Sequence, residues 1–188
     1  MCGQSVSFGV KAGVPVTDAF AAISDSRYSV GTQRWTAGVT AELSLPASLS
    51  VGADLLYRRF SYAYFDASTA SSSASNIGHF ELPVYAKYSF GGHLARPFVE
   101  AGFEFDLAHT STAFTSAMLT ATVSGASSSS QWGAGVLLGG GIEIKVPFLK
   151  IAPELRYMRW QKGVFHDPPS TAGGSETNQI ELLVGVRF

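Results

Sequence analysis

Apolar and polar residues alternate along most of this chain. In the stretch SVSFGVKAGV, residues 5–14, every second position from Val6 to Val14 is apolar. A period of two is typical of a β-strand whose two faces meet different surroundings. Eight stretches show it, and none shows a convincing 3.6-residue period. They cover residues 5–14, 35–45, 49–58, 79–90, 98–107, 131–146, 149–160 and 180–188.

The connections between these stretches are alternately short and long. Short turns are expected at 46–48, 91–96 and 147–148, and long loops at 15–34, 61–78, 108–130 and 161–176. The long ones are rich in Ser, Thr, Ala and Gly, and Asp66–Ser75 is expected to be mobile. An even number of strands with this loop asymmetry is typical of a membrane barrel. The sequence predicts one all-β domain over residues 1–188, an eight-stranded antiparallel up-and-down transmembrane β-barrel, with both termini at the short-turn end.

Alternation alone leaves open which face points inward. A soluble lipocalin-like barrel would bury its apolar face, whereas a membrane barrel would expose it. The glycines favour the second arrangement, because nearly all strand glycines fall in the polar phase, and a glycine weakens an exposed strand for no gain. An eight-stranded barrel is just wide enough inside for its own side chains, so we expect the polar phase to be the crowded inner one.

The short turns predict specific cross-strand neighbours. If Val146 faces Leu149, Gly141 lies opposite Glu154 and Gly139 opposite Arg156. The same counting across the 46–48 turn places Gly52 opposite Glu42. Large charged side chains opposite absent ones are one way to fill a narrow polar interior.

Aromatic residues gather near the predicted strand ends, as two interfacial girdles of a membrane barrel would require. Ordinary aromatic enrichment in strands explains their number but not their position. The group near the long loops is Trp35, Tyr57, Phe80, Phe105, Trp132, Tyr157 and Trp160; the group near the short turns is Tyr88, Phe90, Phe98, Phe148 and Phe188.

Composition narrows the function classes. Charged residues make up 14% of the chain and the net charge is −1, so there is no basic excess to suggest a nucleic-acid partner. The single cysteine, Cys2, excludes an internal disulfide. No apolar run approaches the roughly 20 residues of a membrane-spanning helix. The first residues lack a signal peptide, so either the protein is not exported or residues 1–3 are what remains after removal of one.

The last stretch, IELLVGVRF, resembles the C-terminal strand of bacterial outer-membrane β-barrel proteins, and the whole chain resembles the small eight-stranded OmpA/OmpX-like, porin-family members. The resemblance implies location in the outer membrane, contact with its lipid and a monomeric barrel. It also implies that Leu182, Val184, Val186 and Phe188 are the signal for the barrel-assembly machinery. Two prolines depart from the pattern: Pro83 and Pro153 fall within strands, where we expect bulges.

The polar phase carries nine acids and seven bases, and buried charges must be paired. One interpretation is a salt-bridge network that plugs the barrel, and the other is an ion path. Glu154 and Arg156 are expected to pair with residues of other strands at the same level. The residues expected in this network are Arg58, Glu81, Glu104, Glu154, Arg156 and Glu181. The remaining polar-phase charges are Lys11, Glu42, Asp54, Lys87, Glu100, Asp106, Glu143, Lys145, Lys150 and Arg187.

No pattern predicts a cofactor, a metal or a catalytic centre. His79, His109 and His166 lie near loop ends, and some eight-stranded outer-membrane barrels are lipid A-modifying enzymes with a His–Ser site. FHDPPS, residues 165–170, contains His, Asp and Ser, but adjacency is not triad geometry. GAGVLLGGG lacks the helix of a phosphate loop. Cys2–Gly3 resembles a lipoprotein start, although a signal-peptide remnant ahead of Gln4 explains it better. We therefore predict a structural or surface-interaction role, with a narrow diffusion channel second and a lipid-modifying enzyme third.

Overall fold

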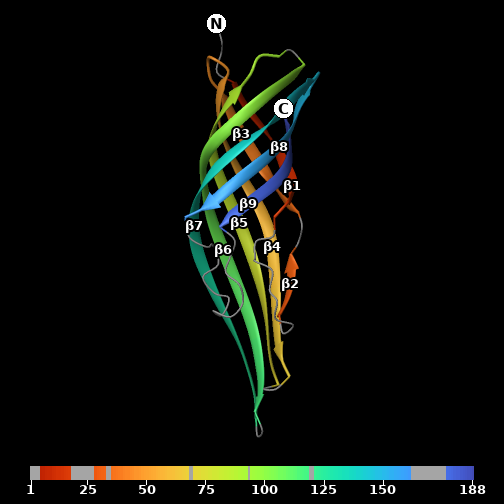
Figure 1. The fold of residues 1–188 in the computed structure, drawn as a ribbon, viewed down its shortest axis with the longest axis vertical. Helices are drawn as coiled ribbons and strands as arrows, with labels where there is room; N and C mark the ends of the chain where they lie inside the picture. The colour runs from red at the N-terminus through yellow and green to blue at the C-terminus, as the bar shows by residue number, and fades with distance from the viewer. Residues whose placement is uncertain are drawn as a thin grey trace.

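Figure 1 shows a computed structural model in which one antiparallel sheet curls into a closed barrel. It describes residues 5–17, 28–32, 35–67, 70–92, 94–118, 121–161 and 177–188. The strands are β1 (Ser5–Pro15), β2 (Tyr28–Thr32), β3 (Thr36–Ser44), β4 (Leu49–Asp66), β5 (Ser71–Ser89), β6 (Ala95–Met118), β7 (Ala121–Val146), β8 (Leu149–Trp160) and β9 (Asn178–Arg187). No helix among the described residues is long and apolar enough to cross a membrane.

The barrel closes through strands that are distant in sequence. β1 pairs with β3 on one side and with β9 on the other, and a pairing between β4 and β5 completes the ring. The ring is therefore β1–β3–β4–β5–β6–β7–β8–β9, which confirms the predicted eight-stranded barrel. β2 lies outside this count, because it pairs only with the part of β4 from Phe60 to Tyr64, beyond the end of β3.

The short turns lie where the sequence places them. β3 and β4 are separated by residues 45–48, and β7 and β8 by Pro147 and Phe148 alone. The register across these turns is also as predicted: Gly141 lies opposite Glu154, Gly139 opposite Arg156, and Gly52 opposite Glu42. The start of β1 and the end of β9 lie at this end of the barrel (Figure 1).

Two of the four expected long loops are instead continuations of strands. β4 and β5 stay paired out to Asp66 and Ser71, and β6 and β7 stay paired out to Met118 and Ala121. The expectation of loops over 61–78 and 108–130 was wrong. Backbone hydrogen bonding to neighbouring strands holds these Ser- and Ala-rich segments extended, although their side chains lack the apolar alternation that marks a strand. Most of the other two expected loops lies outside the described residues.

The two strand prolines do not create bulges. Pro83 interrupts the pairing of β5 with β4, and Pro153 interrupts the pairing of β8 with β7, but the register is the same on both sides of each gap. Each proline is still in register with its other neighbour, Pro83 with Glu104 and Pro153 with Val184. A missing N–H removes ladder bonds on one side only, so no extra residue is needed.

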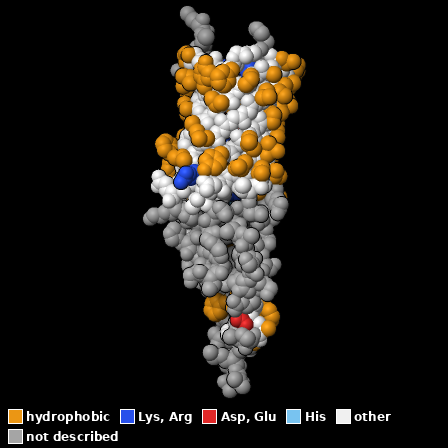
Figure 2. Space-filling view, in the orientation of Figure 1, with side chains coloured by type: hydrophobic (Ala, Val, Ile, Leu, Met, Phe, Trp, Pro, Cys, Tyr) orange, Lys and Arg blue, Asp and Glu red, His pale blue; other side chains and the backbone are white. Residues whose placement is uncertain are grey.

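The apolar phase faces outward and the polar phase inward. Val10 is 55% exposed, whereas the neighbouring Lys11 is 4% exposed. The same contrast holds around the ring, and Figure 2 shows apolar side chains spread over the outside of the barrel. This inverts the usual burial of apolar residues in a water-soluble domain. The choice of an outward apolar face is confirmed.

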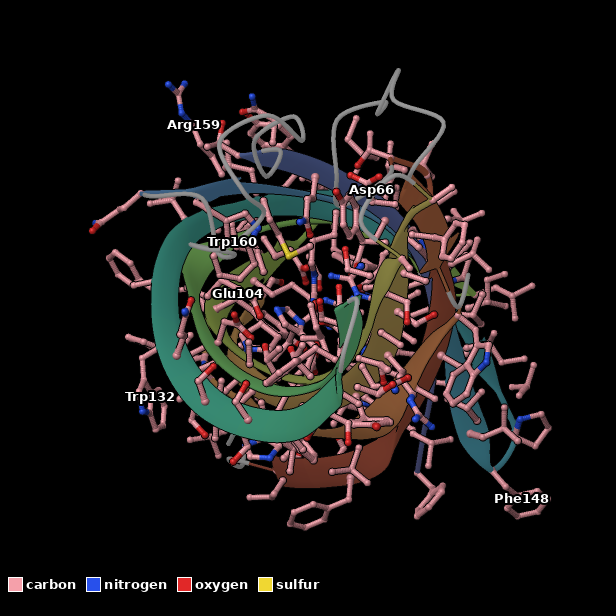
Figure 3. All side chains as sticks on the ribbon, turned by 90° about the horizontal axis from the view of Figure 1, so that it is seen from below. Asp66, Glu104, Trp132, Phe148, Arg159 and Trp160 are labelled. Carbon is pink, nitrogen blue, oxygen red and sulfur yellow. The ribbon has the colours of Figure 1, made fainter. Side chains whose placement is uncertain are left out.

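Two aromatic residues expected on the outside of the barrel, Trp160 and Phe98, point into it instead. Figure 3 shows Trp132 and Phe148 directed away from the barrel and Trp160 directed into it. Trp160 is 2% exposed, and Phe98 is 3% exposed with its ring 4.9 Å from Nζ of Lys87. Both belong to the inward phase of their strands, so proximity to a strand end misassigned them to the outer girdles.

The inner glycines leave space that other side chains use. A Cβ atom at Gly52 would lie 2.5 Å from the ring of Tyr85, and one at Gly139 would lie 2.8 Å from Oε1 of Glu100. The predicted residues do lie opposite these glycines in the sheet. However, the side chains that fill the space beside Gly52 and Gly139 are Tyr85 of β5 and Glu100 of β6, on the strands that the short turns do not connect.

Candidate functional site

The inside of the barrel holds three clusters of charged side chains, one above another along its axis. We call them the turn-end cluster (Glu42, Lys87, Glu143 and Arg187), the central cluster (Lys11, Asp54, Glu100, Glu154 and Arg156) and the outer cluster (Arg58, His79, Glu81, Asp106 and Glu181). All of these residues are buried. Each lies in the inward phase of its strand, so the alternating pattern itself directs the charges into the barrel.

Arg156 is the hub of the central cluster. Its Nη2 lies 2.9 Å from Oδ2 of Asp54, 3.1 Å from Oε1 of Glu100 and 2.9 Å from Oε1 of Glu154. Nζ of Lys11 joins the same group, 2.7 Å from Asp54 and 3.0 Å from Glu154. Two cations from β8 and β1 thus hold three carboxylates from β4, β6 and β8.

Tyr85 supports the central cluster from β5. Its hydroxyl donates to Oδ1 of Asp54 at 3.1 Å. The ring lies beneath two cations, with Lys11 Nζ at 5.2 Å and the Arg156 guanidinium carbon at 5.4 Å from its centroid. A cation over an aromatic face is attracted by the ring quadrupole, so Tyr85 stabilises the two positive groups in addition to bonding an acid.

The turn-end cluster is balanced in charge. Lys87 Nζ lies 2.5 Å from Oε2 of Glu42 and 3.4 Å from Oε2 of Glu143. Arg187 also pairs with both carboxylates, with Nη2 at 2.7 Å from Glu143. Two bases and two acids from four different strands form a closed ring of ion pairs just inside the short turns.

The outer cluster is organised by Arg58. Its Nη1 donates to Oε1 of Glu181 at 2.7 Å, and its Nη2 donates to Oε1 of Glu81 at 2.5 Å and to Oε1 of Gln179 at 3.1 Å. One guanidinium from β4 therefore binds side chains from β5 and β9. Acids outnumber permanent cations in this cluster.

His79 belongs to the outer cluster, although the sequence places it near a loop end. It is 1% exposed, with Nδ1 at 3.1 Å from Oε1 of Glu81 and Nε2 at 2.8 Å from Oδ1 of Asp106. Its ring also meets Trp160 edge-on, with centroids 6.4 Å apart. The signal that could have placed it is its phase, because His79 alternates with Glu81 on β5.

Glu104 lies between the central and outer clusters on β6, and Figure 3 shows it directed into the barrel. It is fully buried, and neither carboxylate oxygen has a hydrogen-bond partner among the described residues. All six residues expected in an interior network are therefore inside. The expected pairing of Arg156 or Glu154 with Glu104, Glu181 or Arg58 was wrong: Arg156 pairs with Asp54, Glu100 and Glu154 itself.

Apolar side chains separate the charged groups inside the barrel, and sequence analysis missed them. Leu56, Leu137, Met158 and Leu183 are each at most 1% exposed. Each occupies an inward position in a run where both phases are apolar, such as Leu55–Leu56 or Leu137–Leu138. In such a run two neighbouring residues are both apolar, so the sequence does not show which one points inward. Only the pairing of the strands identifies the interior residue.

One His–Ser contact occurs at the outer end. Nδ1 of His109 lies 3.0 Å from Oγ of Ser130, across the β6–β7 pairing. The pair is exposed, and no carboxylate bonds to His109 within the described part of the chain. His166 and the FHDPPS segment lie outside the described residues, as does Cys2. GAGVLLGGG lies within β7, and no described group of His, Cys, Asp and Glu could hold a metal.

The sequence of residues 3–159 matches the family model described as an outer membrane protein beta-barrel domain. The chain belongs to this family. Its place is the bacterial outer membrane, and the barrel with an apolar exterior and a charged interior is a small member of that group. Among curated proteins, no sequence matches this outer-membrane barrel.

Solved structures of small outer-membrane barrels resemble this one along nearly their whole length. Neisserial surface protein A is 14% identical, with 98% of this chain and 97% of that chain covered and a TM-score of 0.52. The N-terminal β-barrel domain of Pseudomonas aeruginosa OprF is 18% identical, with 97% and 96% covered and a TM-score of 0.42. Ail, the attachment invasion locus protein of Yersinia pestis, is 11% identical, with 98% and 97% covered and a TM-score of 0.42. At these identities the likeness concerns the fold.

Proposed function

We propose that this outer-membrane barrel is a plugged, non-catalytic scaffold with a structural or surface-interaction role. The observation that carries the proposal is the central cluster, in which Arg156 and Lys11 bridge carboxylates from different sides of the interior. Ion pairs of this kind, with Leu56, Leu137 and Met158 buried on their outer side, leave little room for water. Barrels with 16 or more strands enclose an aqueous channel, and eight-stranded barrels do not.

The outer end would carry the surface role. β6 and β7 remain paired through Met118 and Ala121, whereas β8 leaves β7 at Gly135. The part of β7 from Ala121 to Ala134 spans about 45 Å at the usual rise per residue. Figure 1 shows this hairpin extending away from the end that holds the termini. It presents a sheet surface beyond the apolar band, as an adhesive or binding surface would require.

Several partners follow from the same proposal. The exposed apolar band would contact outer-membrane lipid, and the chain would act as a monomeric single domain. Leu182, Val184 and Val186 lie on the outside of β9, with Phe188 directly after it. In this arrangement the assembly machinery could bind the apolar side chains of the last strand.

Conductance in planar lipid bilayers tests the plug. The wild-type barrel should give no resolved single-channel steps, because the interior ion pairs block passage. Glu104→Gln serves as the matched control: it changes a buried acid but leaves every ion pair of the central cluster in place, so it should also give no steps. Steady ion-selective steps from the wild type would favour the narrow diffusion channel instead.

Mass spectrometry of lipid A tests the absence of catalysis. The exposed contact between His109 and Ser130 is the described feature that most nearly resembles a hydrolytic site. Expression of the wild type should leave the lipid A mass unchanged. A mass change that disappears in Ser130→Ala would replace the scaffold with a lipid-modifying enzyme.

A further inference from the structure

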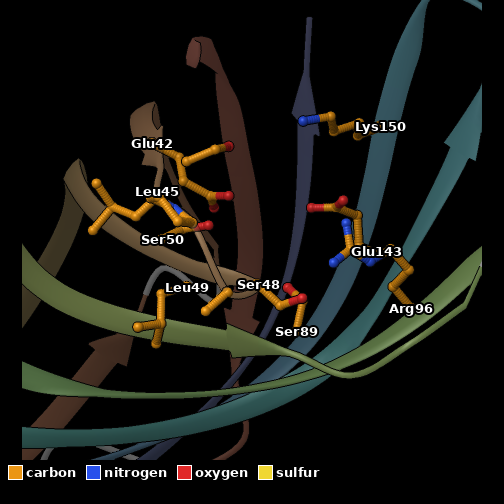
Figure 4. A pocket seen from close by; sticks show the side chains of 12 residues that line it. Glu42, Leu45, Ser48, Leu49, Ser50, Ser89, Arg96, Glu143 and Lys150 are labelled. Carbon is orange, nitrogen blue, oxygen red and sulfur yellow. The ribbon is translucent and has the colours of Figure 1, made fainter. Parts of the chain in front are cut away.

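A pocket of about 210 Å³ opens at the short-turn end of the barrel (Figure 4). Its wall includes four serines, Ser44, Ser48, Ser50 and Ser89, together with Arg96 and Lys150. Ser50 and Ser89 are buried. No other side chain of the described residues bonds their hydroxyl groups. The pocket therefore combines positive charge with hydroxyl groups able to donate to a ligand.

The acids at this mouth are already neutralised. Glu42 and Glu143 also line the pocket, but Lys87 and Arg187 form ion pairs with both of them. Within the described chain, no carboxylate forms an ion pair with Arg96, Lys145 or Lys150, although Arg96 lies directly opposite Glu143 in the sheet. Counting the turn-end cluster with these three residues gives five bases and two acids. An excess of three positive charges thus remains at half-buried positions.

A second pocket, of about 250 Å³, lies on the other side of Lys150. Lys145, Lys150 and Arg187 supply its polar wall, and Phe148 and Phe188 its apolar wall. In the sheet, Lys145 is directly opposite Lys150, and Lys150 is directly opposite Arg187. Like charges directly opposite each other destabilise a sheet. A bound anion between them would remove this repulsion.

The turn beside the first pocket is strained. Ala47 and Ser48 have φ values of 62° and 63° and both line the pocket. This left-handed region is unfavourable for a residue with a Cβ atom. Glycine would relieve the strain, yet the chain has Ala and Ser. Backbone strain of this kind is concentrated at functional and ligand-binding sites, and here it fixes the wall of a basic pocket.

We propose that Arg96, Lys145 and Lys150 bind a phosphate group at the short-turn mouth of the barrel. A phosphate dianion matches a surplus of several positive charges better than a single carboxylate does. The guanidinium of Arg96 can donate two parallel hydrogen bonds to phosphate oxygens, and lysine binds phosphate as a point charge. Ser50 and Ser89 add neutral donors. In outer-membrane barrels the short turns face the periplasm, so the ligand comes from that side.

The phosphate could belong to a phospholipid headgroup or to a soluble phosphate ester. The second pocket distinguishes them, because Phe148 is 91% exposed and Phe188 is 76% exposed beside the shared Lys150. An acyl chain could pack along these rings while the headgroup phosphate binds Lys150. A soluble ester would bind the lysines and Arg96 without using the rings.

Titration of inorganic phosphate into the barrel in a maltoside detergent tests the phosphate site. The wild type should show a saturable rise in thermal midpoint, absent with chloride at equal ionic strength. The double variant Arg96→Gln/Lys150→Gln should weaken binding at least tenfold. The matched control Arg59→Gln/Arg159→Gln, which removes two exposed bases elsewhere, should bind as the wild type does. A rise that is equal in the double variant, or equal with chloride or succinate, would overturn the proposal.

The source of the phosphate is tested with lipid nanodiscs. Phosphatidylglycerol should bind the wild type more tightly than inorganic phosphate if the ligand is a headgroup, and Phe148→Ser should weaken only the lipid. If phosphatidylglycerol adds nothing and Phe148→Ser has no effect, the headgroup is excluded and the soluble ester remains. Loss of inorganic phosphate binding in Phe148→Ser would contradict both, because the ring is not part of the charged site.

Discussion

The central and outer clusters of the interior differ in how many cations pair with their buried acids. Both bury several carboxyl groups inside the barrel. In the central cluster, two permanent cations, Lys11 and Arg156, serve three acids. In the outer cluster, Arg58 is the permanent cation, aided by His79, while Glu81, Asp106 and Glu181 are present and Glu104 lies nearby.

The difference shows that acids and permanent cations are not evenly matched along the interior. The central cluster joins β1, β4, β6 and β8, which are not all neighbours in the ring, so its ion pairs brace the barrel across its width. In the outer cluster, acids outnumber permanent cations. We infer that the central cluster contributes more to stability than the outer cluster does.

The largest expected effect is that of Arg156→Ala. Removing the guanidinium leaves three buried carboxylates with only Lys11 to share, and breaking a buried ion pair typically costs about 3–5 kcal/mol. Urea unfolding of the barrel in lipid vesicles measures the change.

The control for Arg156→Ala is Arg159→Ala, three residues further along β8 and exposed. It should shift the unfolding free energy by about 0.5 kcal/mol or less. If Arg156→Ala leaves stability unchanged and alters the ion selectivity of the barrel, the clusters line a pore and do not plug it.

The next effect tests whether charge is tolerated only on the inner face. Leu138 is 56% exposed on β7, and its neighbour Gly139 lies opposite the buried Arg156. Leu138→Arg should cost about 2–4 kcal/mol, because it places a charge on the apolar outer face at mid-strand. Leu138→Ile, measured the same way, should cost under about 1.5 kcal/mol. Equal stability of the two variants would show that the outer face does not meet lipid.

Much of this comparison follows from the sequence. Period-two alternation places Glu154 and Arg156 inside together, and counting across the Pro147–Phe148 turn gives their opposite residues correctly. Strand number, closure and the outward apolar face follow from the same pattern. These features depend on local spacing, which a single chain displays directly.

The pairing of charges does not follow from the sequence. Arg156 contacts Asp54 and Glu100, which are 102 and 56 residues away. Their relative height depends on the shear of the closed ring, and strand position alone does not give it. The Ser-rich extensions of β6 and β7 were missed for a related reason, because their extended form depends on pairing between strands and not on an apolar face.

A smaller effect is expected for Glu100→Gln in the central cluster. Glu100 accepts hydrogen bonds from Nε and Nη2 of Arg156 at 3.2 and 3.1 Å. An amide keeps one acceptor oxygen but loses the charge, so the cost should be about 1.5–3 kcal/mol, as for a hydrogen bond to a charged group. The loss should shrink in the background of Arg156→Ala. If the stability losses of Glu100→Gln and Arg156→Ala add fully in the double variant, the contact between Glu100 and Arg156 contributes nothing to stability.

The smallest effect is expected for Glu104→Gln, four residues further along β6. Glu104 is as buried as Glu100, but no described residue bonds its carboxyl group. The substitution removes a buried acid without breaking a hydrogen bond, so stability should stay unchanged or rise by about 1 kcal/mol. Measured beside Glu100→Gln, it separates burial from pairing, because the two sites share strand, phase and chemistry. A loss as large as that of Glu100→Gln would show that Glu104 is held by a bound cation or by water.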